Sequence, residues 1–285
     1  ASLDAAPTTD GVNMHDCELK NLLNVNHGIS ACFVKNLRVD NNKIWNDITT
    51  YSPIDNMAID ASRGCVGVEI TNNWIYGFDY GMKCETQINS GPSGTEMRPS
   101  RRVLIANNWL EEIGDPAAFT SGGDNTFGIK VNGTDAVCIG NTVLTRTVSL
   151  TTGGLYAGII VVNTHDMDSH VEVSGNRVVG PKYGILHNDT TVATRECSVD
   201  IHHNRIDSCV LYGASLQGNS TFDNNIVKGA GETGVEIQIA NMTFVRNNRF
   251  LDCGVTDNAV ISAIVGAVYQ STNGAIGGYT EVTGN

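Results

Sequence analysis

The chain has 285 residues, of which 41% are hydrophobic and 17% charged, so it is long enough to bury a large core. Its formal net charge of −12 argues against general binding to nucleic acids or to anionic membranes. The sequence contains no run of about 18 apolar residues, so we expect no membrane insertion. Glycine (31 residues) is frequent, proline (6) is scarce, and no segment sustains a helical apolar period, which favours a strand repeat.

A repeated pattern of alternating apolar residues followed by asparagine dominates the chain. Its copies are 21 to 37 residues apart, and a strand signal led by glycine, such as Gly184-Ile185, falls between them. Each unit is too small to bury an apolar face alone, so the units must stack. Repeats made only of strands stack as a parallel β-helix, and we predict this all-β solenoid. The marker asparagines are Asn42, Asn73, Asn108, Asn141, Asn176, Asn204, Asn225, Asn248 and Asn285.

The pattern also predicts the domain boundaries. We expect residues 1–27 to form an N-terminal cap or a degenerate first coil, and residues 28–285 to form a β-helix domain of about nine coils. The sequence starts without an initiator methionine or a secretion signal, and Val282–Asn285 break off within a repeat. We therefore expect it to be a fragment of a longer chain.

Asparagine suits the turn of each repeat, because it tolerates the left-handed conformation and hydrogen-bonds locally. We predict that the marker asparagines occupy this turn position. Since the coils stack, we also predict that their side chains bond one another along the stack.

The eight cysteines lack the short paired spacings of a zinc site. Several fall at apolar strand positions, as Cys84 and Cys138 do. We therefore predict mostly free thiols in the core, which favours folding in a reducing cytoplasm.

The recurrent V-x-I-x-x-N-x-I and G-I-x-V pattern, from about residue 28 to the end, resembles the right-handed β-helices of the pectate-lyase-like superfamily. The low charge and acidic balance make the chain most similar to bacteriophage tailspike and polysaccharide-depolymerase domains. The resemblance implies a right-handed, single-stranded β-helix in a virion tail, folded in the host cytoplasm and assembled as a homotrimer. It further implies a bacterial surface polysaccharide (capsule or O-antigen) as partner, cleaved outside the cell by carboxylate acid/base glycoside hydrolysis.

Other functions found in the same superfamily stay open, because it also includes lyases, epimerases and inert adhesins. The pectinase signature of paired aspartates with Gly-His-Gly is absent, and Asn163-Thr164-His165-Asp166 only loosely echoes it. One alternative is a non-catalytic receptor-binding or structural shaft of a phage tail. The other is a secreted uronate lyase or epimerase.

The residue after each marker asparagine should point outward, because alternate strand residues face opposite sides. Trp74 and Trp109 take this position on neighbouring coils, and Arg177 and Arg205 take it further along. The tryptophans could stack on sugars, with the arginines nearby to bind acidic sugars. Alternatively, a loop or a neighbouring subunit covers the tryptophan pair.

The strands led by glycine carry Lys83, Glu85 and Lys130 at outward positions. The resemblance places catalytic groups on this strand. A lysine beside a carboxylate suits uronate binding, or proton abstraction if the lysine pKa is lowered. The alternative interpretation is a salt bridge between coils.

The segment 163–170 contains the densest group of titratable side chains. Asp166 and Asp168 are candidate catalytic carboxylates, and His165 is a candidate substrate ligand. We expect no cofactor, although such oxygen ligands would suit calcium. An ordinary polar turn explains the same residues.

Glu172 and Asp200 lie four residues before their marker asparagines, at outward positions on neighbouring coils. Two stacked carboxylates repel, so one should keep its proton to higher pH, as an acid/base pair requires. Alternatively, both carboxylates are solvated and paired with Arg177 or Arg205.

Apolar residues at predicted outward positions indicate an interface between subunits, and we predict a homotrimer from them as well. These residues are Leu104, Val137, Ile160, Val162, Leu186, Ile226 and Phe244.

Overall fold

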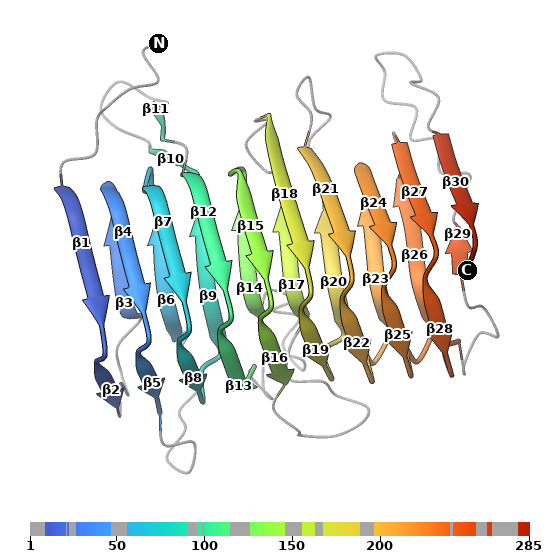
Figure 1. The fold of residues 1–285 in the computed structure, drawn as a ribbon, viewed down its shortest axis with the longest axis horizontal. Helices are drawn as coiled ribbons and strands as arrows, with labels where there is room; N and C mark the ends of the chain where they lie inside the picture. Colours follow the sequence, from blue (N-terminus) through green and yellow to red (C-terminus); the bar gives the residue numbers. More distant parts are fainter. Residues whose placement is uncertain are drawn as a thin grey trace.

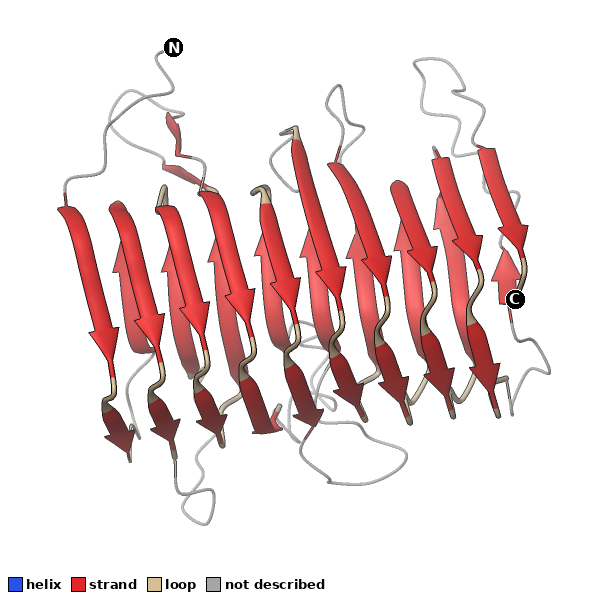
Figure 2. Cartoon of the chain, viewed as in Figure 1, coloured by secondary structure: helices blue, strands red, loops and turns tan. Residues whose placement is uncertain are grey.

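A computed structural model describes most of the chain. The described residues are 9–20, 22, 27–46, 56–89, 96–98, 100–114, 126–145, 156–162, 168–188, 197–239, 242–254, 261–263 and 279–285. Figures 1 and 2 show a prism built from strands, with no helix among these residues.

Three parallel sheets form the faces of the prism, and we name them A, B and C. Sheet A contains β1 (Thr9–His15), β4 (Val34–Asp40), β7 (Val66–Thr71), β12 (Arg101–Ala106), β15 (Ala136–Ile139), β18 (Ser169–Ser174), β21 (Cys197–His202), β24 (Asn219–Asp223), β27 (Met242–Arg246) and β30 (Tyr279–Thr283). Sheet B contains β2 (Glu18–Lys20), β5 (Lys43–Trp45), β8 (Trp74–Tyr76), β13 (Trp109–Ile113), β16 (Thr142–Thr145), β19 (Arg177–Val179), β22 (Arg205–Asp207), β25 (Ile226–Lys228) and β28 (Arg249–Leu251). Sheet C contains β3 (His27–Cys32), β6 (Met57–Ser62), β9 (Tyr80–Glu85), β14 (Phe127–Asn132), β17 (Ala157–Val162), β20 (Tyr183–Asn188), β23 (Tyr212–Gln217), β26 (Thr233–Ile239) and β29 (Ile261–Ala263).

The chain visits sheets A, B and C in turn, so three consecutive strands make one coil. We number the coils from coil 1 (β1–β3) to coil 9 (β27–β29), with β30 next in sheet A. Coil 4 consists of β12–β14, because an antiparallel hairpin of β10 (Gln87–Asn89) and β11 (Glu96–Arg98) precedes it. The predicted parallel β-helix is confirmed. The first described coil includes β1 and β2, which lie within the segment expected to be a cap or degenerate coil.

Inward side chains stack from coil to coil and form one continuous core. The residue two positions after the marker asparagine is fully buried in coils 2 to 8, as predicted, and each such side chain contributes about 1.5–3 kcal/mol. The glycines of sheet C face this stack. A Cβ on Gly81 would lie 2.4 Å from the Leu110 side chain and 2.2 Å from the Gly128 carbonyl oxygen, so only glycine allows this approach.

The marker asparagines form a buried ladder between sheets A and B. Asn73 shows the pattern: its Nδ2 donates to Asn108 Oδ1 and to Val39 O, both at 2.9 Å. Its Oδ1 accepts from the backbone N and the Nδ2 of Asn42, both at 3.0 Å. The same bonds link successive coils as far as Asn285, which confirms the predicted bonding along the stack.

The left-handed conformation belongs to the residue before the ladder asparagine, so our assignment to the asparagine itself was wrong. Asn72, which precedes Asn73, has φ of 58°, whereas Asn73 is not among the residues with positive φ. The preceding residue makes the corner and points to solvent. The ladder asparagine must instead turn its amide inward, where its donors and acceptor are satisfied by neighbouring coils.

The prediction that seven apolar side chains form an exposed outer row is partly wrong. Val162 and Leu186 are only 7% and 3% exposed, so the chain itself covers them. Ile226 is exposed at 39%. The remaining members of the row are half-buried: Leu104, Val137, Ile160 and Phe244.

Candidate functional site

The predicted site residues are distributed over all three sheets. Trp74, Trp109, Arg177 and Arg205 lie on sheet B, and Lys83, Glu85 and Lys130 lie on sheet C. Glu172 and Asp200 lie on sheet A, and Asp168 directly precedes β18 of that sheet. His165 and Asp166 lie outside the described residues. The structure does not unite these groups into one site.

Sheet B carries four aromatic residues on its outer face in coils 2 to 4. We call Trp45, Trp74, Tyr76 and Trp109 the aromatic array. Trp74 is in register with Trp109, and Trp45 with Tyr76, on neighbouring parallel strands. The rings of Trp74 and Tyr76 are stacked, with centroids 5.6 Å apart and an interplanar angle of 17°. The predicted placement of the tryptophan pair on neighbouring coils is therefore confirmed.

Sequence reasoning missed two members of this array. Trp45 and Tyr76 lie two residues after an outward position that had already been identified, so strand alternation places them on the same face. The signal was present in Lys43-Ile44-Trp45 and Trp74-Ile75-Tyr76, where one buried isoleucine separates two outward residues.

Polar contacts hold the edges of the array. Lys43 Nζ lies 5.1 Å from the Trp74 ring centroid and 5.7 Å from that of Trp45, within range of a cation–π interaction. Trp109 Nε1 donates to Glu111 Oε2 at 3.2 Å, and Trp109 remains 41% exposed. Trp45 Nε1 likewise donates to Glu18 Oε1 at 3.2 Å. The indole N–H groups of Trp45 and Trp109 are thus satisfied within the protein, which leaves their apolar ring surfaces for a ligand.

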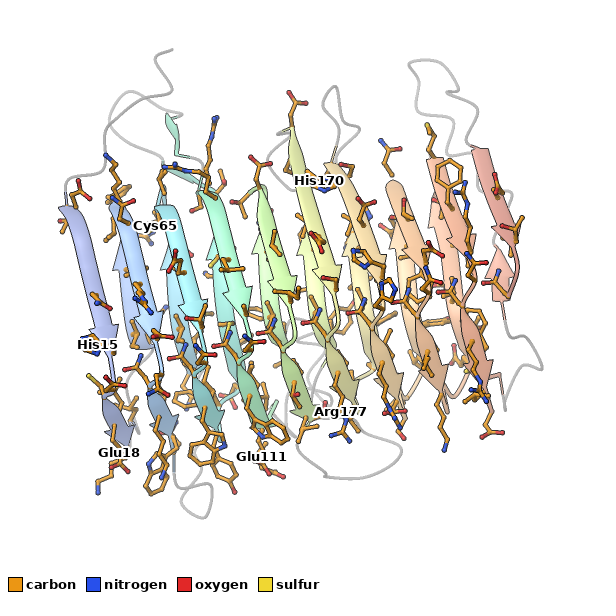
Figure 3. The ribbon with its side chains drawn as sticks, in the orientation of Figure 1. His15, Glu18, Cys65, Glu111, His170 and Arg177 are labelled. Atoms are coloured by element: carbon orange, nitrogen blue, oxygen red, sulfur yellow. The ribbon has the colours of Figure 1, made fainter. Side chains whose placement is uncertain are left out.

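The array and the arginines share one face. In Figure 3, Glu18, Glu111 and Arg177 lie along the same lower row of side chains. Arg177 and Arg205 are exposed and in register with each other on β19 and β22. Thr142 lies between Trp109 and Arg177 in the same register.

Sheet C carries a charged network across coils 1 to 4. Lys83 Nζ lies 3.7 Å from Asp60 Oδ1 and 3.5 Å from Glu85 Oε1. Lys130 Nζ lies 3.5 Å from Glu85 Oε2, and His27 Nε2 lies 3.1 Å from Asp60 Oδ2. The side chains of Lys83 and Glu85 are only 18% and 15% exposed. The salt bridge between coils, offered as the alternative for these residues, is the arrangement that the structure contains.

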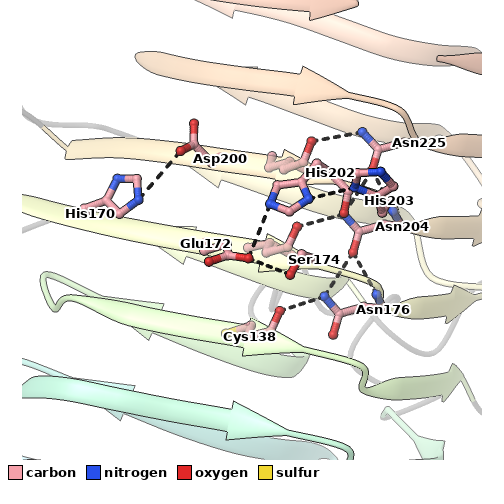
Figure 4. Close-up of polar contacts among 12 residues, drawn as sticks. Cys138, His170, Glu172, Ser174, Asn176, Asp200, His202, His203, Asn204 and Asn225 are labelled. Carbon is pink, nitrogen blue, oxygen red and sulfur yellow. Dashed lines mark hydrogen bonds and ion pairs between the residues drawn. The ribbon is translucent and has the colours of Figure 1, made fainter. Parts of the chain in front are cut away.

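Sheet A brings Glu172 and Asp200 into register on β18 and β21, as predicted. Glu172 Oε1 lies 3.3 Å from His202 Nε2 and accepts a bond from Ser174 Oγ at 2.8 Å, as Figure 4 shows. Asp200 Oδ2 lies 3.6 Å from His170 Nε2. The pair therefore forms two histidine–carboxylate contacts on one face.

The alternative in which Glu172 and Asp200 pair with Arg177 or Arg205 was wrong. Arg177 and Arg205 lie on sheet B, beyond the turn that follows the ladder asparagine, and Arg205 Nε bonds Asp207 Oδ2 at 2.7 Å instead. The histidines could have been found from the sequence. His170 and His202 lie two residues from Glu172 and Asp200, respectively, so alternation puts them on the same side of sheet A.

Within the described ranges, no group of three or more histidine, cysteine, aspartate or glutamate side chains is placed to hold a metal ion. The calcium expectation depended on Asp166, which lies outside them. The same ranges contain no helix long and apolar enough to cross a membrane.

None of the eight cysteines, all of which lie in the described part of the chain, forms a disulfide bond, as predicted for most of them, and five are buried. Burial raises the pKa of Cys138 to about 12, so its reactive thiolate is scarce at neutral pH.

Comparison with known proteins adds a fold assignment. Residues 192–279 match a family model described as right handed beta helix region, which covers coils 7 to 9. Searches of curated proteins and of solved structures gave no match. The family description names a fold and no activity. The three parallel sheets and this match together show that the chain folds as a right-handed parallel β-helix.

Proposed function

We propose that this chain is a polysaccharide-binding β-helix domain of the phage tailspike type, which attaches a virion tail to a bacterial capsule or O-antigen through sheet B. The observation that carries the proposal is the aromatic array. Four aromatic side chains on three neighbouring strands form a platform about 10 Å long, since parallel strands lie about 4.8 Å apart. Flat aromatic rings suit the apolar C–H faces of sugar rings.

The rigid scaffold supports this function energetically. The array stands on β5, β8 and β13, whose inward residues are fully buried, and its rings are fixed by Lys43 and Glu111. A ligand therefore binds side chains that are already ordered, so the entropy cost of binding is small.

The test compares Trp109→Ala with Ile139→Ala. Ile139 lies on sheet A and is 40% exposed, close to the 41% of Trp109, so it controls for loss of an exposed apolar side chain. Binding to a panel of purified capsules and O-antigens is measured by affinity electrophoresis. We expect Trp109→Ala to weaken binding at least tenfold, about 1.4 kcal/mol, and Ile139→Ala to leave it unchanged. Equal binding by both variants, or no binding of the wild type to any member of the panel, would contradict the proposal.

Cleavage of the polysaccharide is the second candidate function, and Glu172 with Asp200 carries it. The two carboxylates project from neighbouring strands about 4.8 Å apart, which is closer to the carboxyl spacing of retaining glycosidases, about 5–5.5 Å, than to that of inverting enzymes. His202 beside Glu172 provides a group that can exchange protons with it. Asp168, exposed at the start of β18, is a further carboxylate near this pair in the chain.

The aromatic array and this carboxylate pair lie on different sheets, with coil 5 between them along the axis. Binding and cleavage are therefore tested separately. Release of reducing ends should disappear in Glu172→Gln and Asp200→Asn and persist in Glu85→Gln, whose carboxylate belongs to the sheet C network. Release of unsaturated products instead would favour a uronate lyase. Unchanged host adsorption without any product would favour a non-catalytic receptor-binding shaft.

Assembly as a homotrimer belongs to the same proposal. Exposed Met242 and Val282 on sheet A are apolar side chains that a subunit interface would cover. Light scattering of the purified protein should give three times the chain mass of 30.4 kDa. A monomeric mass would contradict this assembly.

A further inference from the structure

We infer that the polymer bound by the array is an acidic polysaccharide that lies along the β-helix axis, with its anionic groups on basic residues of coils 6 to 9. This inference rests on the proposed function and specifies the ligand class of the same face. We call the outward residues of β19, β22, β25 and β28 the basic strip. It consists of Arg177, Val179, Arg205, Asp207, Ile226, Lys228, Arg249 and Leu251.

The basic strip continues the array in the same register. The outward position that holds Trp109 in coil 4 holds Thr142 in coil 5 and Arg177 in coil 6. Arg177 therefore lies about 10 Å beyond Trp109 along the axis. An extended polymer stacked on the array and running along the axis meets these arginines next.

The charge of the basic strip is opposite to that of the whole chain. Four of its eight residues are basic and one is acidic, whereas the chain carries a formal net charge of −12. Such a local excess attracts anionic ligands to this face while the rest of the surface repels them. Nucleic acid is the less favoured polyanion, because its uniform backbone charge would meet the acidic remainder of the surface.

The positive charge of the pair Arg177 and Arg205 is only half balanced within the protein. Their side chains stand directly opposite on neighbouring strands, where like charges destabilise a sheet. Asp207 Oδ2 accepts a bond from Arg205 Nε at 2.7 Å and neutralises one of the two guanidinium groups. Within the described part of the chain, no carboxylate pairs with Arg177. A bound anionic group would supply the missing charge, and guanidinium binds carboxylate or sulfate in a two-pronged geometry.

The lysines of sheet C, which are the other basic residues predicted to bind a sugar acid, are already engaged. On sheet C, Lys83 and Lys130 are both paired with Glu85. On sheet A, the outward residues of coils 6 and 7 include the carboxylates of Glu172 and Asp200. The basic strip is therefore the surface, among the described residues, that best matches an acidic polymer.

The experiment uses alginate, a uronic-acid polymer, and the same polymer with its carboxyl groups chemically reduced. Binding of the whole chain is measured by calorimetry over a range of salt concentrations. Arg177→Gln is compared with Arg101→Gln, which removes an exposed positive charge from sheet A instead. We expect the wild type to bind alginate at least fivefold more tightly than the reduced polymer. We also expect Arg177→Gln to lose most of that preference and part of the salt dependence, and Arg101→Gln to retain both.

The outcomes separate this inference from the proposed function. If Trp109→Ala abolishes binding of both polymers while Arg177→Gln and Arg101→Gln behave alike, the inference fails and polysaccharide binding stands. If neither polymer binds the wild type but neutral capsules do, the inference fails and the proposed function stands. If Arg177→Gln instead changes the oligomeric mass, or if DNA binds as tightly as alginate, the basic strip serves another partner and the inference is overturned.

Discussion

His187 makes the stability of this β-helix depend on pH. It points into the core from β20, is fully buried, and lies in register with Val161 and Leu216 of the neighbouring coils. Its Nδ1 is 2.7 Å from Ser220 Oγ, and within the described residues its Nε2 has no hydrogen-bond partner. Burial lowers the pKa of His187 to about 3, because the charged imidazolium would lose its hydration.

The direction of the effect follows from where the proton binds. Well above pH 6.5 the ring is neutral in the folded and the unfolded chain, so it contributes no pH dependence there. Between pH 6.5 and about 3, only the unfolded chain takes up the proton, so the free energy of unfolding falls as pH falls. At pH 5 the loss amounts to about 2 kcal/mol, from 1.5 pH units at about 1.36 kcal/mol each.

The test is urea unfolding of the wild type and of His187→Leu at pH 7.5 and pH 5. Leucine suits the position, since Leu216 occupies the same stack in the next coil. We expect the wild type to lose about 2 kcal/mol more than the variant between the two pH values. Ser220→Ala is the control: it removes the hydrogen bond but keeps the ring, so it should retain the wild-type pH dependence. Equal pH dependence of His187→Leu and the wild type would refute this reasoning.

Three further predictions concern the scaffold. Asn141→Ala should lower the free energy of unfolding by about 2–4 kcal/mol in urea titrations, because Asn108 N, Asn108 Nδ2 and Ile105 O lose their buried partner and Asn176 Oδ1 loses one of its two donors; an unchanged midpoint would show that the ladder does not stabilise the fold. Gly128→Ala should lower the free energy of unfolding by about 1–3 kcal/mol in the same titration, since the new Cβ would lie 2.5 Å from a side-chain carbon of Val143. A stability equal to that of the wild type would mean that sheets B and C can move apart at this point without cost. A thiol reagent at neutral pH should label exposed Cys17 and spare Cys138, whose pKa is raised to about 12 by burial, as read by mass spectrometry; rapid labelling of Cys138 would indicate that the core opens.

Much of the fold followed from local patterns. The period of two along a strand identified inward positions such as Ile75 and Val178, and the recurring asparagine predicted the ladder. These features depend only on which residues repeat and on strand geometry. The same alternation also placed Trp74 beside Trp109, and Glu172 beside Asp200.

The sequence by itself therefore determined the β-helix, its ladder and the pairing of residues on neighbouring coils. The reason is that stacking places the same position of successive repeats side by side. The tertiary structure alone decided which charges meet: Glu172 and Asp200 contact histidines, and Arg205 contacts Asp207. It also decided that Leu186 is covered and that the candidate residues occupy three different faces. The physical reason is that side-chain contacts depend on the angle between sheets and on distances of a few ångströms, and a repeat pattern does not specify either of them.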